Sequence, residues 1–493
     1  MKSRAQALKE GLDIKAQALQ RRDRAYRRIV EYGLLAVIIF SPLPAASVYE
    51  WSILVIQVLV LVMLAAYILM REKPQSSELL SLSLKWPRYL FSGLFVFILV
   101  QLIPLPRFLI KVISPNTYSF HNLFNPDFAE VKFMSLSLIP SHTLREGLEL
   151  LIYFLLGYLI VKTVTRRKQI MRIVYVLVIM GFFEAFYGMY EMYNKNPRLL
   201  FLKKVHYLDV VTGTFVNRNH LSGYLEMIIP LAVGLIIARI GLFSLAGLRW
   251  REKILRLSEK GLSTNLLLTA GIVVMAVGVI FSKSRSGIFL LVFTFFLFFE
   301  LTVLYFGRMR ERQKWIKDFL KVSFLAITII VLLIGMGSVI ERFALDDLLH
   351  EGRPVVWGKV VSIIGDYPLF GTGLGTFASV YPAYDESGGS RRYSHAHNDY
   401  LEYLSEIGII GLIMFFGGVV FLITNSFLIW RVRRHPEVKG LALGGMVGLI
   451  AILIHSITDF NLHIPANMVL FTVVLSLTAV IAFYKRGERN LSK

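Results

Sequence analysis

Long runs of residues with almost no charge constrain this chain more than any other feature. A helix of about 18 to 20 apolar residues crosses the roughly 30 Å of hydrocarbon in a bilayer. With 55% hydrophobic and 18% charged residues, the 493-residue chain is too apolar for an ordinary soluble protein. We therefore predict an all-α integral membrane protein with about 12 transmembrane helices. The runs lie near residues 29–47, 51–70, 89–105, 147–164, 170–190, 220–243, 265–281, 288–306, 322–339, 407–430, 441–457 and 466–484.

The net charge of +21 comes from Lys and Arg residues whose positions indicate how the chain is oriented in the membrane. If the N-terminus is cytoplasmic, the tail and every second connection carry 38 of the 54 Lys and Arg residues, and the opposite side carries 16. Positive charge gathers on the cytoplasmic side of membrane proteins, so both termini are expected in the cytoplasm. Contact with anionic lipid then accounts for the basicity, and no nucleic-acid partner is expected.

This topology divides the chain into five segments. Within the outward loop between spans nine and ten, "GRPVVWGKVVSIIGDY" (352–367) has apolar residues at helical spacing and predicts an amphipathic surface helix. The glycines of "PLFGTGLGTF" favour a tight turn over a nucleotide-binding loop. The segments are a basic cytoplasmic tail able to form an amphipathic helix (1–28), spans one to nine (29–339), a periplasmic loop (340–406), spans ten to twelve (407–484) and a cytoplasmic tail (485–493).

Three arginines lie on the outer side, each next to an apolar run: Arg218, Arg285 and Arg353. Arginines in such places often extend toward lipid phosphate. However, residues 340–402 contain five Lys or Arg against nine Asp or Glu, so there is no broad basic field. Because guanidinium matches phosphate with paired donors, we expect these arginines to bind a specific anion.

The stretch "SHAHNDYLEYLSEIGIIGL" places two histidines directly before an apolar run. A structural role for each of His395 and His397 and metal binding by the pair are both open, although Asp399 and Glu402 complete no zinc pattern. No metal and no cofactor are expected. The remaining option is general base catalysis by a histidine, for which imidazole has a suitable pKa. Asp399 or Glu402 is expected to orient it.

The last outward connection is "HSITDFNLHIPANM", residues 455–468. Asp459 and His463 lie there among apolar residues. The sequence leaves open whether they hydrogen-bond each other or the backbone, and whether their role is structural or functional.

Five motifs, in this order, resemble the O-antigen ligase and polymerase superfamily. They span residues 213 to 467, more than half of the chain. The motifs are "GTFVNRNHLSGYLEM" (213–227), "SRSG" (284–287), "GRPVVWGKVVSIIGDYPLFGTGLGTF" (352–377), "HNDYLEYLSEIGIIG" (397–411) and "HSITDFNLHIPAN" (455–467).

The resemblance implies a GT-C-like helical bundle in the bacterial inner membrane. Such proteins take a glycan from undecaprenyl diphosphate on the periplasmic face. They pass it to lipid A core, to another lipid-linked repeat or to protein. By the motif match His397 is the catalytic residue, and Arg218, Arg285 and Arg353 bind the diphosphate. Supporting positions are Asn398, Asp399, Tyr400, Glu402, His395 and Asp459, whereas Arg391 and Arg392 match no family feature.

Both lines of reasoning give one mechanism. Arginines would stabilise the leaving diphosphate in place of a divalent cation, and His397 would deprotonate the acceptor hydroxyl. One base and no evident covalent nucleophile predict inversion at the anomeric carbon. The rival is a transporter or flippase of lipid-linked glycans or small solutes. It is disfavoured because the polar residues gather at one face and not at the bilayer midplane.

Overall fold

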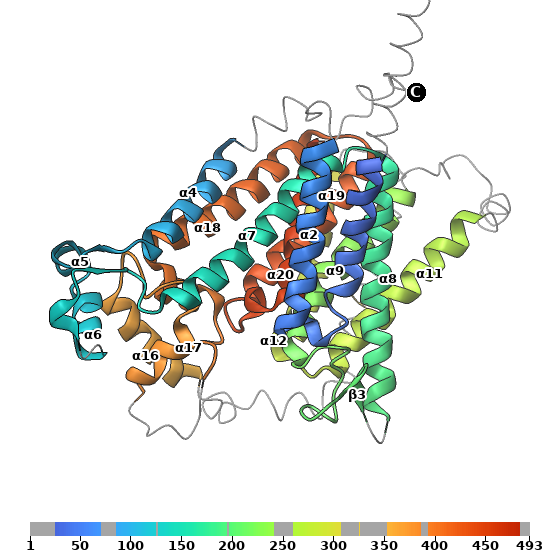
Figure 1. Ribbon diagram of the computed structural model, residues 1–493. Coiled ribbons are helices and arrows are strands. Elements are labelled where there is room, and N and C mark those ends of the chain that lie inside the picture. The colour runs from blue at the N-terminus through green and yellow to red at the C-terminus, as the bar shows by residue number, and fades with distance from the viewer. Residues whose placement is uncertain are drawn as a thin grey trace, which may run out of the picture.

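The computed structural model is a bundle of long helices (Figure 1). It describes residues 25–70, 85–124, 127–194, 197–240, 260–306, 325, 353–385 and 393–483. Within these residues, eight helices are long and apolar enough to cross a membrane. The chain is therefore a multi-pass membrane protein.

Eleven of the twelve predicted spans coincide with helices of the described residues. The ninth, near 322–339, the tail 1–24 and the stretch 484–493 lie outside them. A helix covers residues 25–40. The other long helices are α2 (Glu50–Met70), α4 (Lys85–Leu102), α7 (Pro140–Thr163), α8 (Arg167–Met192), α9 (Arg218–Ile240), α11 (Lys260–Phe281), α12 (Arg285–Phe306), α18 (Asp399–Val432), α19 (Pro436–His455) and α20 (Pro465–Phe483).

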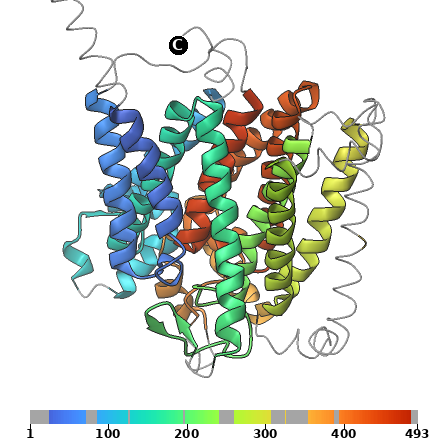
Figure 2. The same ribbon diagram turned by 90° about the vertical axis from the view of Figure 1, so that its right-hand side faces the viewer.

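Three helices form the centre of the bundle. α9 and α20 are buried along their apolar lengths, and α19 is mostly buried. The outer helices instead expose apolar side chains, such as Leu54 and Val58 of α2, to the surroundings. Figure 1 shows α4, α7 and α18 side by side and inclined relative to α2 and α8. Figure 2, turned by 90°, shows the helix of residues 25–40 lying along α2.

Short elements cover the end of the bundle at which α9, α12 and α18 begin. The connection between α4 and α7 contains α5 (Arg107–Ile113), α6 (Pro115–Phe124), η2 (Phe128–Glu130) and the antiparallel pair β1 (Leu105–Pro106) and β2 (Phe133–Met134). Leu105 pairs with Met134. The remaining short elements are η1 (Ala45–Ser47), β3 (Arg198–Leu199) with β4 (Leu202–Lys203), α16 (Arg353–Asp366), α17 (Phe377–Val380), η4 (Tyr381–Ala383) and η5 (Asn461–His463).

The amphipathic helix predicted in the large loop is α16. Val356, Val360 and Ile363 are buried against the loop core, whereas Val355 is exposed. The Trp357 indole donates to the carbonyl of Ala396 at 2.9 Å. This bond ties Ala396, which lies between His395 and His397, to α16.

The predicted loop 340–406 includes the first turns of a long helix. α18 begins at Asp399, inside the predicted loop, and its helical conformation breaks at Gly408 (φ 60°, ψ −174°). The carbonyls of Ser405 and Glu406 accept from the amides of Thr372 and Gly373. Gly371, Gly373 and Gly375 all have positive φ, so the predicted tight turn is confirmed, and it supplies the partners that the break requires.

Small residues let the central helices α9 and α19 approach closely. A Cβ added at Gly444 of α19 would lie 2.5 Å from the carbonyl oxygen of Pro230 in α9. Close contact between backbones is a common way to pack helices in lipid.

We expect Gly444→Ala to lower the thermal stability of the protein, because overpacking a tight interface costs about 1–3 kcal/mol. Gly358→Ala on α16 is the control, since nothing lies within 4 Å of that added Cβ. Thermal unfolding in lipid nanodiscs measures both. Equal melting temperatures would contradict the account of α9–α19 packing.

Candidate active site

The first turn of α18 positions the two histidines. Asn398 caps the helix, its side-chain oxygen accepting from the amide of Leu401 at 3.1 Å. Asp399 and Glu402 follow in the first turn, where the helix dipole stabilises carboxylates. His397 precedes the cap with a φ of 52°, a conformation that a residue other than glycine rarely adopts. Strained backbone of this kind gathers at functional sites.

His397 contacts Asp459 from the hairpin between α19 and α20. Its Nδ1 lies 3.3 Å from Asp459 Oδ1, a long hydrogen bond. The Asp459 side chain is only 1% exposed, and three more side chains approach it. Asn219 donates to Oδ2 at 2.5 Å, His220 Nε2 lies 3.7 Å from Oδ1, and Arg353 Nη2 lies 3.9 Å from Oδ2.

These neighbours keep Asp459 ionised. Burial acts to raise its pKa, but the nearby imidazoles of His220 and His397 and the charge of Arg353 hold the pKa well below its usual range. A buried carboxylate that contacts Nδ1 of an imidazole fixes its tautomer and orientation. Asp459 is therefore placed to orient His397.

Asp399 and Glu402, expected to orient a catalytic histidine, are in contact with histidines other than His397. Asp399 accepts from His463 Nδ1 at 2.7 Å and from the amide of Leu462. Glu402 contacts His395 Nδ1 at 2.8 Å and accepts from the amide of Ala396. Both carboxylates therefore belong to a second cluster, with His395 and His463.

Phe460 lies between the two clusters. The ring of His395 stacks on it at 4.1 Å with an interplanar angle of 13°. The rings of His397 and His220 meet Phe460 edge to face at 4.9 and 4.6 Å. One aromatic ring thus separates the imidazole that Asp459 holds from the imidazole that Glu402 holds.

The three predicted arginines each begin a helix: Arg218 α9, Arg285 α12 and Arg353 α16. Arg353 donates to the carbonyl of Thr458 at 2.9 Å, beside Asp459. The N-termini of these three helices also carry the positive ends of the helix dipoles, which favour anions.

Contacts beside Arg285 and Arg218 bring their helices to the same hairpin. Ser286, next to Arg285, hydrogen-bonds Thr458 at 2.8 Å. Asn219, next to Arg218, is the residue that binds Asp459. The Arg218 guanidinium itself lies over the ring of Tyr207, 5.2 Å from its centroid. The hairpin therefore joins the segments that carry all four of the predicted residues.

The remaining supporting residues have structural contacts. The Tyr400 hydroxyl donates to the carbonyl of Leu453 at 2.7 Å and ties α18 to α19. Arg391 and Arg392 lie outside the described residues. Within the described part of the chain, no group of three or more His, Cys, Asp or Glu has the arrangement of a metal site.

The sequence did not assign roles to Asn219, His220, Thr458, Phe460 or His463. Asn219 and His220 follow Arg218 directly, and this run of three polar residues before an apolar helix was the available signal. Nothing in the local pattern around Phe460 indicated that its ring divides the site.

Comparison with known proteins identifies a family that part of the chain resembles. Residues 270–416 match a family described as O-antigen ligase. This match supports membership of the O-antigen ligase and polymerase superfamily. The matched segment includes Arg285, Arg353 and His397, and ends before Asp459. A search of curated proteins found no match. The family supports a membrane glycosyltransferase of the O-antigen ligase type.

The second cluster predicts a pH dependence of stability. Burial acts to lower the pKa of His463, but the charge of Glu402 and the hydrogen bond to Asp399 raise the pKa to about 10. The pKa of His463 in the folded protein exceeds the ordinary value of 6.5. The stability that protonated His463 adds to the fold is therefore complete below pH 6.5 and is lost as the pH rises to about 10.

We therefore expect His463→Gln to flatten the fall in melting temperature between pH 6.5 and pH 10. Thermal unfolding across this range measures the slope, with His142→Gln at an exposed position of α7 as the control. A slope unchanged by His463→Gln would show that His463 is not held protonated.

Proposed function

We propose that this protein transfers a glycan from undecaprenyl diphosphate to a sugar hydroxyl on the periplasmic face of the bacterial inner membrane. The observation that carries the proposal is the buried carboxylate of Asp459, which lies 3.3 Å from His397 and 3.9 Å from Arg353. This carboxylate lies next to the proposed base and next to a guanidinium, and the O-antigen ligase match supports the reaction class.

In the proposed step, the acceptor oxygen attacks the anomeric carbon of the donor sugar. With Nδ1–H donated to Asp459, Nε2 of His397 carries the lone pair that takes the hydroxyl proton. The bond from the anomeric carbon to the diphosphate breaks, and its electron pair leaves with the diphosphate. The glycan moves to the acceptor, and undecaprenyl diphosphate is released.

The arginines act on the leaving group. Negative charge grows on the diphosphate as the bond breaks, and preorganised donors stabilise it more in a site shielded from water. Arg353, held by the carbonyl of Thr458, is fixed next to the base. Arg218 and Arg285 complete the proposed diphosphate site from the starts of α9 and α12.

Two further features of the reaction follow. Direct attack, with one base and no covalent intermediate, inverts the anomeric configuration. The arginines take the part that a divalent cation plays in other sugar transferases, so the reaction is proposed to be metal-independent. The distribution of basic residues supports cytoplasmic termini and a periplasmic site.

We expect His397→Ala and Asp459→Asn to lower kcat by about 10²- to 10⁴-fold, the usual contribution of a general base and of the group that orients it. Product analysis with purified protein and an undecaprenyl-diphosphate oligosaccharide measures turnover. His142→Ala is the control. Unchanged turnover in His397→Ala, in protein that melts like the wild type, would remove the proposed base.

The same assay identifies the acceptor and tests whether the reaction requires a metal ion. Longer lipid-linked chains would indicate a polymerase. Transfer to lipid A core would indicate a ligase, and a glycosylated polypeptide would indicate a protein glycosyltransferase. We expect equal turnover with and without chelator. Loss of activity on chelation, restored by a divalent cation, would overturn the metal-independent mechanism, and a stable sugar adduct on the protein would contradict inversion.

A further inference from the structure

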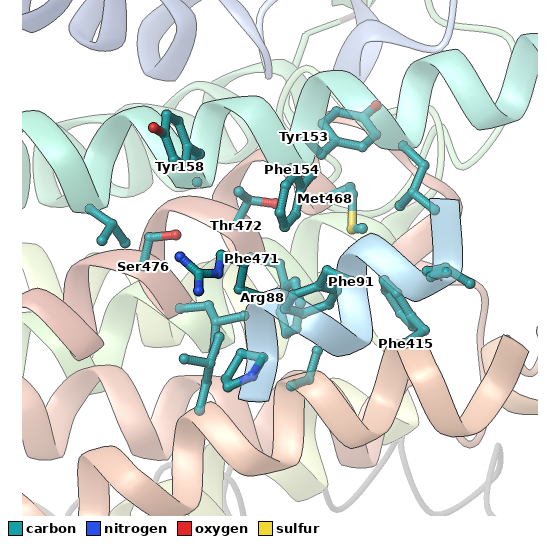
Figure 3. Close-up of a pocket in the computed structure, with 18 of the residues that line it drawn as sticks. Arg88, Phe91, Tyr153, Phe154, Tyr158, Phe415, Met468, Phe471, Thr472 and Ser476 are labelled. Carbon is teal, nitrogen blue, oxygen red and sulfur yellow. The ribbon is translucent and has the colours of Figure 1, made fainter. Parts of the chain in front are cut away.

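A pocket of about 370 Å³ lies between α4, α7, α18 and α20, and none of the residues assigned to the candidate active site lines it. Figure 3 shows Arg88 and Ser476 at one end of the pocket and Tyr153 and Phe415 at the other. Between these ends the lining is mainly apolar. Its phenylalanine rings are those of Phe91, Phe95, Phe154, Phe415 and Phe471.

Both charged residues of the lining are cations. Arg88 lies in the first turn of α4, and Lys162 lies in the last turn of α7. α18 ends at this same end of the bundle, opposite the candidate active site (Figure 1). The start of α4 carries a positive dipole end and the end of α7 a negative one, so the charge here comes from the two side chains. An anion at this end would meet positive charge from two helices.

Hydroxyl groups accompany the two cations. Tyr158, Thr472 and Ser476 line the pocket, and Thr472 and Ser476 lie one turn apart on α20, where side chains share a face. The Lys162 ammonium lies 5.7 Å from the centre of the Tyr158 ring. A hydroxyl donates readily to a phosphate or ester oxygen. Charge and hydrogen-bond donors at this end are therefore suited to a phosphate ester.

The depth of the pocket matches one leaflet of a bilayer. Along α7 the lining runs from Leu150 to Lys162, a distance of about 18 Å at about 1.5 Å per residue. Each leaflet contributes about half of the roughly 30 Å of hydrocarbon. The pocket therefore suits an acyl chain that enters from the cationic end. Since the surrounding lipid is as apolar as the lining, selectivity among lipids has to come from the headgroup.

The other end of the pocket does not favour one sign of charge. Leu150, Tyr153 and Met468 also line a second cavity, of about 320 Å³. Charges of both signs line that cavity, from Arg145, Glu146, Glu149, His395, Glu402, Glu406 and His463. A single sign of charge distinguishes only the end with Arg88 and Lys162.

We propose that this pocket binds an anionic phospholipid from the leaflet opposite the candidate active site. One acyl chain occupies the apolar part, and Arg88 and Lys162 hold the phosphate. Basic pockets between transmembrane helices recognise anionic lipid heads in this way. The basic face as a whole attracts anionic lipid without order, whereas this pocket holds one lipid at a defined place. A phosphate bound by both cations ties α4 to α7, and the site does not depend on the proposed reaction.

Photoaffinity labelling of the full-length protein in phosphatidylcholine nanodiscs tests the site. The two probes carry the same diazirine in one acyl chain and differ only in the head, which is phosphatidylglycerol in one and phosphatidylcholine in the other. We expect the phosphatidylglycerol probe to label pocket residues of α4, α7, α18 and α20 at least about fivefold more, which is about 1 kcal/mol. Mass spectrometry of the labelled peptides measures the ratio.

A pair of charge variants tests the headgroup contact. The double variant Arg88→Gln/Lys162→Gln should label equally with the two probes. Its control is Lys168→Gln/Arg434→Gln, which removes two exposed cations at the same end of the bundle but outside the lining, and which should retain the fivefold preference.

A second pair tests the chain. Leu422→Trp fills the pocket and should abolish labelling there, whereas Ile413→Trp, on an exposed face of the same helix, should not. All variants are compared only where the protein melts like the wild type. Arg88→Lys, which keeps the charge, should retain the preference for phosphatidylglycerol.

Equal labelling of the wild type by the two probes would overturn the proposal, because it would make the pocket an unselective lipid groove. So would a preference that survives Arg88→Gln/Lys162→Gln, or labelling that Leu422→Trp leaves intact. Unlabelled undecaprenyl diphosphate is the competitor that tests another occupant. If it removed the labelling as completely as unlabelled phosphatidylglycerol, in the wild type and in the double variant, the pocket would belong to the donor's chain and the proposal would fail.

Discussion

The buried negative charge of Asp459 is the interaction on which the candidate site depends. A carboxylate 1% exposed stays ionised only when donors and positive charge surround it. Here the surrounding groups come from α9 (Asn219 and His220), from the segment before α18 (His397) and from α16 (Arg353). Four parts of the chain that are distant in sequence therefore meet at one charge. Removing that charge would leave two imidazoles and a guanidinium without the partner that sets their positions.

The central helices make this meeting possible. α9 and α19 approach closely through glycines such as Gly234, Gly440 and Gly444, so the start of α9 lies beside the hairpin that follows α19. The turn at Gly408 has a related effect on α18, because the glycine-rich segment 371–375 binds the carbonyls freed by the break. The first turns of α18 are thereby held apart from its long apolar remainder. Rigid elements thus support each candidate residue, which catalysis by preorganised charge requires.

The sequence predicted most of the helices because membrane spans are defined by local hydrophobicity, and it predicted α16 because its apolar residues recur at helical spacing. It also indicated His397, Arg218, Arg285 and Arg353, since polar residues beside apolar runs are few. It led us to expect Asp399 or Glu402 to orient a catalytic histidine, whereas the acid in contact with His397 is Asp459. Asp399 and Glu402 are near in sequence, whereas Asp459 lies 62 positions away and becomes a neighbour only through packing of the hairpin. The dividing role of Phe460 likewise depends on tertiary contacts.

The most direct test of the central claim is the cryo-EM structure of the full-length protein in nanodiscs with undecaprenyl diphosphate. We predict density for the diphosphate between Arg353, Arg285 and Arg218, within hydrogen-bonding reach of a guanidinium and next to His397. His397 Nδ1 should remain in contact with Asp459. Diphosphate density away from these three arginines, or an Asp459 that has turned away from His397 in the complex, would contradict the account.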